Sequence, residues 1–390
     1  MSNGSSRRVA PVRPSPWHRG RPKLRAPHDV NEVDVTRSFT ARPGRRIAGL
    51  AAAVAAAGLL LSACSSDDTA GSTGDASGDA GSFDAVSVQL SWLKNQQFAG
   101  EYLAVEDGLY TDAGFADVTL TAGGSSATSA EAAVASGQAF VGLSSPLITA
   151  PAIQSGAALK IVGATYQQNP FALVSAASAP IAGPDDLAGK TIAVSDSNTL
   201  VWNAFLAAND IDASEVTTVP LSDTSMLTTG QVDGFIGYTT TGAAALAAAG
   251  FEATEFLLAE NGLPMVGEVL VTSQEAIDER PEEVKAFLLA TAEGWRAALD
   301  DPERAVDLTV NTYGKEQQYD ADAIALSFDR QATLIESDDT AANGLLTISP
   351  ELQEGTIASL GYAGVDIAAD ELFDLSLLDE VYAENPDLLS

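Results

Sequence analysis

From residue 86 onward the sequence alternates short strand-like segments with helical segments. Val86, Val88, Leu90 and Trp92 alternate with polar residues, a period of two that indicates a β-strand. A helical stretch over 98–107 follows, and the alternation then repeats along the chain. Because strand, helix and strand at this spacing favour parallel pairing through right-handed crossovers, the sequence predicts an α/β fold.

The predicted elements form two blocks and a helical end. The first block contains strands and helices over 118–121, 129–136, 140–143 and 145–156. The second contains them over 191–194, 200–208, 216–219, 235–238 and 242–249. After a further strand over 266–272 the chain becomes mostly helical, and Trp295 falls on the apolar stripe of a packed helix. We assign Trp295 to the core, and Trp202 also to the core with a ligand contact as the alternative.

The charge and two residue types exclude several classes of function. Eleven of the 20 Lys and Arg precede Cys64, against three acidic residues, so the part from Cys64 onward carries 9 basic and 50 acidic residues, a charge of −41. Such a surface repels phosphate, which excludes nucleic acid as a partner. Both histidines, His18 and His28, precede Cys64, the only cysteine. The remainder therefore lacks histidine triads, zinc sites built from His and Cys, and thiolate chemistry, whereas chemistry by carboxylates alone stays open.

The N-terminal segment over 1–63 has the features of an export signal with a polar extension. Arg45 and Arg46 precede an apolar run over 47–61, the length of a signal-peptide core but short for a membrane span. The run ends in Leu-Ser-Ala-Cys64, which resembles the lipobox of bacterial lipoproteins and implies lipid attachment at Cys64. Residues 1–44 are long for such a signal, and one hypothesis places the translation start near Val35. Twin-arginine export stays open beside general export, although the residues after Arg46 match it poorly.

A flexible linker is predicted to follow the lipidated cysteine, so that 64–83 forms an anchor and tether. Residues 65–82 are all Gly, Ser, Thr, Ala and Asp. A coil of this composition and length reaches roughly 20 to 25 Å. We expect it to hold the folded part just clear of the outer face of the cell membrane.

Four segments in order resemble the nitrate, sulfonate and thiamine-precursor binding proteins of ABC importers, a group that includes thiamine pyrimidine synthase-like proteins. Residues 86–124 resemble the family's opening, and the later segments are DDLAGKTIAV (185–194), GQVDGFIGY (230–238) and RPEEVKAFLLATAEGWRAALDDPERAV (280–306). No single segment is as specific as a metal-ligand set. Their order extends the resemblance over nearly all of 84–390.

The resemblance implies the type II periplasmic-binding-protein fold, with two α/β lobes and a ligand cleft between them. Lobe 1 would combine 84–168 with 266–390, and lobe 2 would be 169–265. The family's role implies a monomer that takes up a small-molecule ligand, docks on membrane permease subunits, uses no cofactor or metal and is not an enzyme. Enzymes that share the fold depend on His or Cys chemistry, which the chain after Cys64 lacks.

In sheets of this kind ligands bind beyond the carboxyl ends of the strands, and that rule names the candidate contacts. They are Trp92, Gly123, Gly124, Ser125, Ser144, Ser145, Gln167, Ser195, Ser197, Asn198, Tyr238, Thr239 and Glu268. The serines and Asn198 are equally well explained as helix caps, and the glycines as turn formers. For Trp92 we favour ligand stacking over a core position, Tyr238 is open between the two, and Glu268 has the alternative of a solvated strand residue.

The candidate contacts favour a flat heterocycle with polar edges, such as the pyrimidine precursor of thiamine. Lys94 is the only basic residue near a predicted loop end, whereas nitrate or sulfonate would benefit from a cation. An aromatic stack contributes about 0.5 to 1.5 kcal/mol, and micromolar affinity requires about 8.2 kcal/mol, so lobe closure must add burial and hydrogen bonds. Helix N-termini also bind anions, which keeps an anionic ligand open. A ligand sensor without transport is a further alternative.

Overall fold

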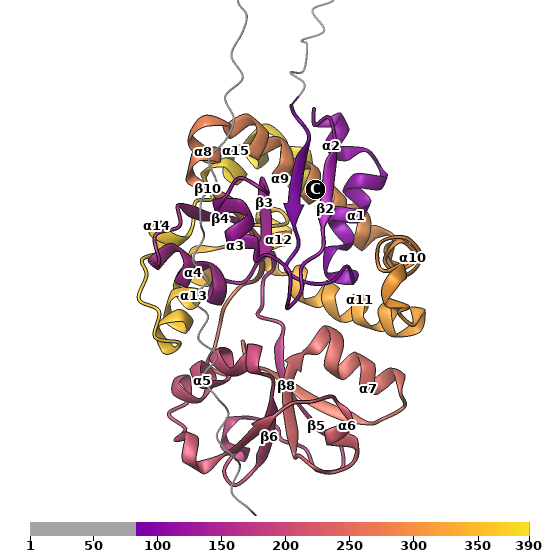
Figure 1. Ribbon diagram of the computed structural model, residues 1–390, viewed down its shortest axis with the longest axis vertical. Coiled ribbons are helices and arrows are strands. Elements are labelled where there is room, and N and C mark those ends of the chain that lie inside the picture. Colours follow the sequence, from indigo (N-terminus) through magenta and orange to yellow (C-terminus); the bar gives the residue numbers. More distant parts are fainter. Residues whose placement is uncertain (1–82, 390) are drawn as a thin grey trace, which may run out of the picture. The chain divides into compact units, whose positions relative to one another are not determined.

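The computed structural model describes residues 83–389 (Figure 1). The predicted export signal, Cys64 with its lipid and the flexible linker lie outside these residues. Within the described part, the chain forms two five-stranded sheets with helices packed against them. None of the helices over 83–389 is long and apolar enough to cross a bilayer.

The first sheet has the strand order β2-β1-β3-β10-β4. Its strands are β1 (Val86–Gln89), β2 (Val118–Thr121), β3 (Val141–Ser144), β4 (Leu159–Tyr166) and β10 (Gly267–Ser273). β1 pairs in parallel with β2 and β3, as predicted. β10 arrives from far along the chain and pairs antiparallel with both β3 and β4.

The second sheet has the order β7-β6-β8-β5-β9 and lies between β4 and β10 in the sequence. Its strands are β5 (Phe171–Ala176), β6 (Thr191–Val194), β7 (Thr217–Pro220), β8 (Gly234–Tyr238) and β9 (Ala253–Leu257). β6 pairs in parallel with β7 and β8, whereas β5 pairs antiparallel with β8 and β9. Both sheets are therefore mixed, with a parallel set joined to antiparallel neighbours.

The helices divide between the two sheets in the order of the chain. Those before β5 are a 3₁₀ turn η1 (Gln96–Phe98), α1 (Ala99–Glu106), α2 (Leu109–Asp112), α3 (Ala130–Ala135) and α4 (Pro146–Gln154). Those between β5 and β10 include η2 (Pro184–Asp186), η3 (Asp196–Asn198), α5 (Thr199–Ala208), η4 (Ala213–Glu215), α6 (Ser225–Thr228), a π-helical turn η5 (Thr239–Ala243) and α7 (Ala244–Ala248).

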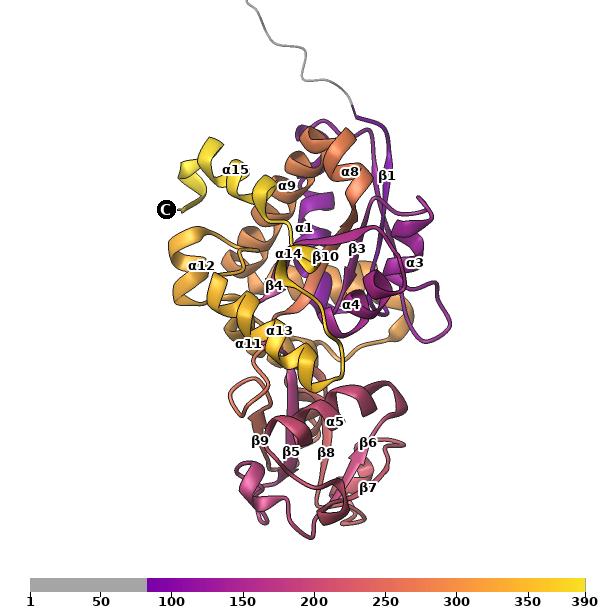
Figure 2. The same ribbon diagram turned by 90° about the vertical axis from the view of Figure 1, so that its left-hand side faces the viewer.

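The helices after β10 pack beside the first sheet, where Figure 2 shows the C-terminal ones in yellow, and two of them also contact helices of the second sheet's region. They are α8 (Gln274–Glu279), α9 (Pro281–Asp300), α10 (Pro302–Asp307), η6 (Leu308–Tyr313), η7 (Lys315–Gln317), α11 (Ala321–Ile335), α12 (Asp338–Asn343), α13 (Pro350–Tyr362), α14 (Ala369–Leu372), α15 (Ser376–Glu384) and η8 (Pro386–Leu389).

Local sequence signals set several helix starts. The Ser145 side chain accepts a hydrogen bond from Leu147 N at 3.4 Å, and Pro146 occupies the first turn of α4, as the sequence predicts. The Ser129 side chain caps α3 in the same way by accepting from Ala132 N at 3.2 Å. These caps satisfy backbone N–H groups that have no partner within the helix.

The core of the first sheet's region depends on a close crossing of α1 and α9. Trp295 is fully buried, as predicted, and its ring occupies the space that a side chain at Gly100 would fill. A Cβ at Gly294 would lie 2.7 Å from the Cβ of Ala104. Two glycines therefore allow the helices to approach closely, and Trp295 fills the remaining volume. In the second sheet's region Trp202 is also buried, and its Nε1 donates to Thr218 Oγ1 at 3.0 Å.

The sequence pattern predicted no strand at β4, β5 or β9. β4 is buried at seven of its eight positions and β5 at four of its six. A strand that is covered on both faces has no alternation of polar and apolar residues, so the period-two signal is missing. The helix predicted over 242–249 begins earlier as the π turn η5, and α7 ends at Ala248.

Candidate functional site

The carboxylate of Glu268 forms the centre of a buried polar cluster between β10 and the loop after β1. Glu268 is 5% exposed. Its Oε1 accepts a hydrogen bond from Ser91 Oγ at 2.6 Å, and its Oε2 accepts one from Gln97 Nε2 at 3.1 Å. Asn95 orients Gln97, because Asn95 Nδ2 donates to Gln97 Oε1 at 2.8 Å. The sequence predicted Glu268 but missed its partners, which lie over 170 residues away in the chain.

The backbone of Glu268 is strained. Its φ is +46°, in the left-handed region that a residue with a side chain rarely adopts inside a strand. Such a conformation costs of order 1 to 3 kcal/mol and persists only where the surroundings enforce it. Strain of this kind concentrates at ligand and active sites, which makes the outlier a pointer to function.

Burial also changes the protonation of the groups around Glu268. It raises the pKa of Glu268 to about 7, although the hydrogen bonds from Ser91 and Gln97 oppose the change. Burial, and secondarily the charge of Glu268, raises the pKa of Tyr238 well above its ordinary range. The charge of Glu268 thus acts on the neutral hydroxyl of Tyr238, although the two residues belong to different sheets.

A second layer of hydrogen bonds supports this cluster from α11. Tyr166 OH donates to Gln331 Oε1 at 2.9 Å, and Gln331 Nε2 donates to the carbonyl of Gln96 at 2.9 Å. Gln331 is fully buried. Because Gln96 precedes Gln97, α11 fixes the backbone that carries one of the two donors to Glu268.

The loop after β1 presents Trp92 to solvent. Trp92 is 44% exposed, an unusual exposure for the largest side chain, and its carbonyl accepts a hydrogen bond from Gly123 N at 2.8 Å. A Cβ at Gly123 would lie 2.6 Å from the carbonyl carbon of Ser91, so this approach requires glycine. Gly124 has a φ of +121°, and Ser125 is exposed. Gly123 and Gly124 therefore allow the loop after β2 to lie against the loop after β1, beside Trp92.

Ser144 and Ser145 have partners within the protein. Ser144, at the end of β3, donates through Oγ to Glu131 Oε1, which also accepts from Thr149 Oγ1 at 3.0 Å. Glu131 is 4% exposed, and its Oε2 has no hydrogen-bond partner among the described residues. Ser145 caps α4. The sequence did not predict Glu131, because a glutamate in the first turn of a helix is ordinary in sequence.

The candidates after β6 lie near the surface. Ser195 Oγ and Ser197 Oγ are 3.0 Å apart, and Ser197 Oγ donates to Asn198 Oδ1 at 3.4 Å. Asn198 occupies the N-cap position of α5 but its side chain makes no capping hydrogen bond. Of these residues Ser197 is exposed, and the other two are half-buried.

Tyr238 ends β8 and Thr239 begins η5, beside a basic residue that the sequence did not predict. The half-buried Tyr238 ring meets the Phe171 ring edge-on at 4.7 Å. Arg330 of α11 donates through Nη1 to Thr239 Oγ1 at 3.0 Å and pairs with Glu255 of β9. The expectation that Lys94 is the only basic residue near a loop end is therefore wrong. Arg330 lies 91 positions from Thr239 in the chain, so no local sequence pattern indicates that the two are in contact.

Lys94 itself lies 5.4 Å from the centre of the Tyr313 ring. Gln167 lies buried in the segment that leaves β4, where its Nε2 donates to the carbonyl of Thr347 at 3.0 Å. Among the described residues its Oε1 has no partner, and the same holds for the buried Nδ2 of Asn169. This connecting segment thus carries polar atoms that are available for water or a ligand.

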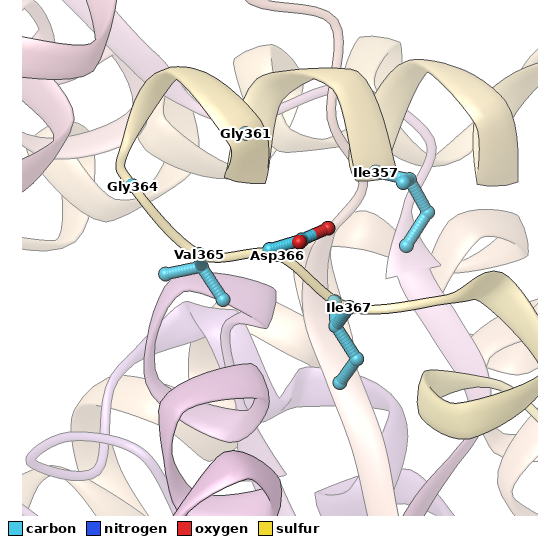
Figure 3. Close-up of a pocket in the computed structure, with 6 residues that line it drawn as sticks. All are labelled: Ile357, Gly361, Gly364, Val365, Asp366 and Ile367. Atoms are coloured by element: carbon cyan, nitrogen blue, oxygen red, sulfur yellow. The ribbon is translucent and has the colours of Figure 1, made fainter.

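The cavity drawn in Figure 3 is a different place. Its volume is about 320 Å³, and its lining is Ile357, Gly361, Gly364, Val365, Asp366 and Ile367, from α13 and the turn before α14. None of the predicted contacts lines it. Residues 83–389 also contain no group of three or more His, Cys, Asp or Glu side chains that could hold a metal ion.

The sequence of the chain matches a known protein family. The sequence model of the family described as "NMT1/THI5 like" matches residues 95–305, more than half of the chain. The chain belongs to the NMT1/THI5-like family. The matched range includes β10 with Glu268 and begins at the last residue of the loop that follows β1, so that Ser91 and Trp92 precede it.

A curated relative of this NMT1/THI5-like chain is the riboflavin-binding protein RibY of Chloroflexus aurantiacus. The two are 28% identical over 232 residues, which is 58% of this chain and 65% of the relative. The match therefore spans just under two thirds of the relative's length.

Solved structures share the fold. The aliphatic sulphonate binding protein SsuA of Escherichia coli superposes with a TM-score of 0.55 at 16% identity, covering 73% of this chain and 88% of its own. The nitrate-binding protein NrtA of Synechocystis gives 0.56 at 12% identity, with 78% and 91% covered. The desulfurization enzyme DszB gives 0.52 at 15% identity, with 77% and 99% covered. The fold is that of the periplasmic binding proteins, as the sequence resemblance implied.

Proposed function

We propose that this protein is the solute-binding component of an ABC importer and captures a flat heterocycle outside the cell. In this proposal Cys64 carries a lipid anchor, residues 84–168 with 266–390 form one lobe, and 169–265 form the other. The protein acts as a monomer, delivers its ligand to permease subunits in the membrane, and makes or breaks no covalent bond.

The observation that carries the proposal is Glu268, whose backbone is strained and whose carboxylate is buried. Glu268 has a left-handed backbone inside a strand, and strain of this kind persists at a stability cost and concentrates at functional sites. Within residues 83–389 its carboxylate accepts two hydrogen bonds, from Ser91 and Gln97, and a carboxylate has about four acceptor positions. A ring N–H or exocyclic amine at the edge of a heterocycle would use the remaining capacity.

Two aromatic residues complement this polar group. Trp92 is exposed on the loop whose Ser91 contacts Glu268, and Tyr238 lies within range of the charge of Glu268. Each offers a face on which a planar ring can stack, at about 0.5 to 1.5 kcal/mol. The riboflavin-binding relative supports a planar heterocycle of this type, whether an isoalloxazine or the aminopyrimidine first considered.

The charges argue against the anionic ligands named for the structural neighbours. Arg330, the cation nearest to Thr239, is neutralised by its pairing with Glu255. Glu268 and Glu131 add two buried acidic side chains, Glu268 within the proposed site and Glu131 as the hydrogen-bond acceptor of Ser144. An anion would have to bind near these groups, at an electrostatic cost that a neutral ring with N–H donors avoids.

The test is a thermal-shift and calorimetric screen with riboflavin, 4-amino-5-hydroxymethyl-2-methylpyrimidine, an alkanesulfonate and nitrate. A ligand at 100 times its Kd stabilises the folded state by about 2.7 kcal/mol, so a heterocycle that binds raises the melting temperature. We expect a response to at least one of the two heterocycles and none to the anions. A response to sulfonate or nitrate alone would refute the assignment of ligand class.

The matched variant is Glu268→Gln, which keeps the size of the side chain and removes the charge. Because Glu268 has a pKa of about 7, ligand N–H donors gain a charged acceptor as the pH rises from 6 to 8, and the affinity should increase up to about tenfold. In Glu268→Gln the affinity should be lower and independent of pH over this range. An unchanged affinity and pH profile would show that Glu268 does not contact the ligand.

A further inference from the structure

Helix α11 contacts elements of both sheets through neighbouring residues. Gln331 accepts a hydrogen bond from Tyr166 of β4, in the first sheet, at 2.9 Å. Arg330, the preceding residue, donates to Thr239 of η5 and pairs with Glu255 of β9, in the second sheet. One turn of a single helix therefore connects the segments that carry Glu268 with those that carry Tyr238.

Arg330, Thr239 and Glu255 form a closed triangle, which we call the clasp. Arg330 Nη1 donates to Thr239 Oγ1 at 3.0 Å and to Glu255 Oε1, and Thr239 Oγ1 donates to the same Glu255 Oε1 at 2.9 Å. The ionic side chains are 30% and 21% exposed, and Thr239 is buried. A pair with this degree of burial and a third hydrogen-bonding partner is stronger than an isolated surface pair.

The clasp acts directly beside a proposed ligand contact. Thr239 follows Tyr238 in the chain, and its backbone N–H donates to the carbonyl of Pro170 at 3.0 Å. The side chain of Thr239 is held by α11, whose Gln331 also holds the carbonyl of Gln96 beside Gln97. Fixing Thr239 to α11 thus fixes the backbone of Tyr238 relative to the partners of Glu268.

We infer that Arg330 is a positioning residue for ligand retention. Any movement that separates Tyr238 from Glu268 must break the clasp, so the clasp slows release, and Arg330 acts through Thr239 without touching the ligand itself. The inference rests on the proposed binding function and adds to it a specific residue that sets the dissociation rate. Because opening precedes release of a bound ligand, a contact that holds the protein closed acts mainly on the dissociation rate.

The test compares Arg330→Gln with the wild type, with riboflavin as the probe in stopped-flow fluorescence. We expect dissociation to become about five- to tenfold faster, while association changes less than twofold and the midpoint of urea unfolding stays close to that of the wild type. Arg304→Gln is the control, because it breaks the Arg304–Asp107 pair, with side chains 41% and 30% exposed, between α10 and α1 of the first sheet's region. The control should leave the dissociation rate unchanged. Equal dissociation rates for Arg330→Gln and the wild type would overturn the inference.

A charge exchange tests the pairing itself. Arg330→Glu and Glu255→Arg should each accelerate riboflavin release, and the double variant should recover a rate within about twofold of the wild type. Additive losses in the double variant would show that the two residues act separately and would overturn the clasp.

A measurement without ligand separates the failure of this inference from the failure of the proposed function. Small-angle X-ray scattering of the ligand-free protein should give a larger radius of gyration for Arg330→Gln than for the wild type and Arg304→Gln. If the wild type binds neither riboflavin nor the aminopyrimidine, the proposed ligand class is wrong. The radii of gyration then test the clasp by themselves. Equal radii for all three proteins would then overturn the clasp.

Discussion

Glu101 is a buried acid that the proposed binding site does not use, and it predicts how stability depends on pH. It lies fully buried in α1, where Trp295 Nε1 donates to its Oε1 at 3.3 Å. Among the described residues its Oε2 has no hydrogen-bond partner. Burial raises the pKa of Glu101 to about 8 from an ordinary value of 4.5.

The direction of the effect follows from proton linkage. Between pH 4.5 and about 8 the folded state holds a proton on Glu101 that the unfolded state has released, so the free energy of unfolding falls as the pH rises through this window. At about 1.4 kcal/mol per pH unit, the contribution is up to about 5 kcal/mol, of which roughly 3 kcal/mol is lost between pH 5 and pH 8. Glu268 adds a second contribution of the same sign that ends near pH 7.

The perturbation is Glu101→Gln, which keeps an oxygen acceptor for Trp295 and cannot ionise. Urea unfolding at pH 5, 6, 7 and 8, followed by tryptophan fluorescence, measures the free energy of unfolding. We expect the decline of the wild type between pH 5 and pH 8 to shrink by roughly 3 kcal/mol in the variant. Glu354→Gln, at an exposed position of α13, is the control and should retain the decline of the wild type. Parallel pH profiles for Glu101→Gln and the wild type would refute the reasoning that burial keeps Glu101 protonated.

Two further predictions concern the helix crossing and the exposed tryptophan. Gly294→Ala should lower the free energy of unfolding by about 1 to 3 kcal/mol, because its Cβ would lie 2.7 Å from the Cβ of Ala104. Gly361→Ala, where the new Cβ would lie in open space on α13, should raise the free energy of unfolding by about 0.4 to 1 kcal/mol. Urea titrations of both variants check this pair, and a stable Gly294→Ala would contradict the close crossing. Trp92→Ala should weaken riboflavin binding by up to about tenfold and leave the melting temperature of the ligand-free protein within about 1 °C, because Trp92 is 44% exposed. Calorimetry and thermal unfolding measure the two effects, and loss of stability without loss of affinity would mean that Trp92 is structural.

The sequence predicted those elements of the fold that carry a local signal. β2 and β6 have the predicted bounds, and the Ser145-Pro146 start of α4 is confirmed, because alternation and capping are visible within a few residues. The buried strands β4 and β5 escaped prediction, since a strand without a polar face has no period. Local patterns also could not show that β10 lies between β3 and β4, because pairing between distant segments is decided by packing.

The same distinction explains what was predicted of the candidate site. The rule that ligands bind beyond strand ends named Trp92 and Tyr238, and Glu268 was predicted from its place in the return strand near the expected hinge. It could not supply Gln97, Glu131 or Arg330, which reach the strand ends from helices or turns elsewhere in the chain. Ser144 is the opposite case. It lies at a strand end as predicted, but its hydroxyl donates a buried hydrogen bond to Glu131 within the protein.

The position of β10 has a consequence for how the protein forms. β4 has β10 as its neighbour in the first sheet, and β3 is flanked by β1 on one side and β10 on the other. Until Gly267–Ser273 has been synthesised, β3 and β4 each lack a hydrogen-bonding partner along one edge. The first quarter of the described chain thus stays an incomplete sheet on the ribosome until the whole second sheet has emerged.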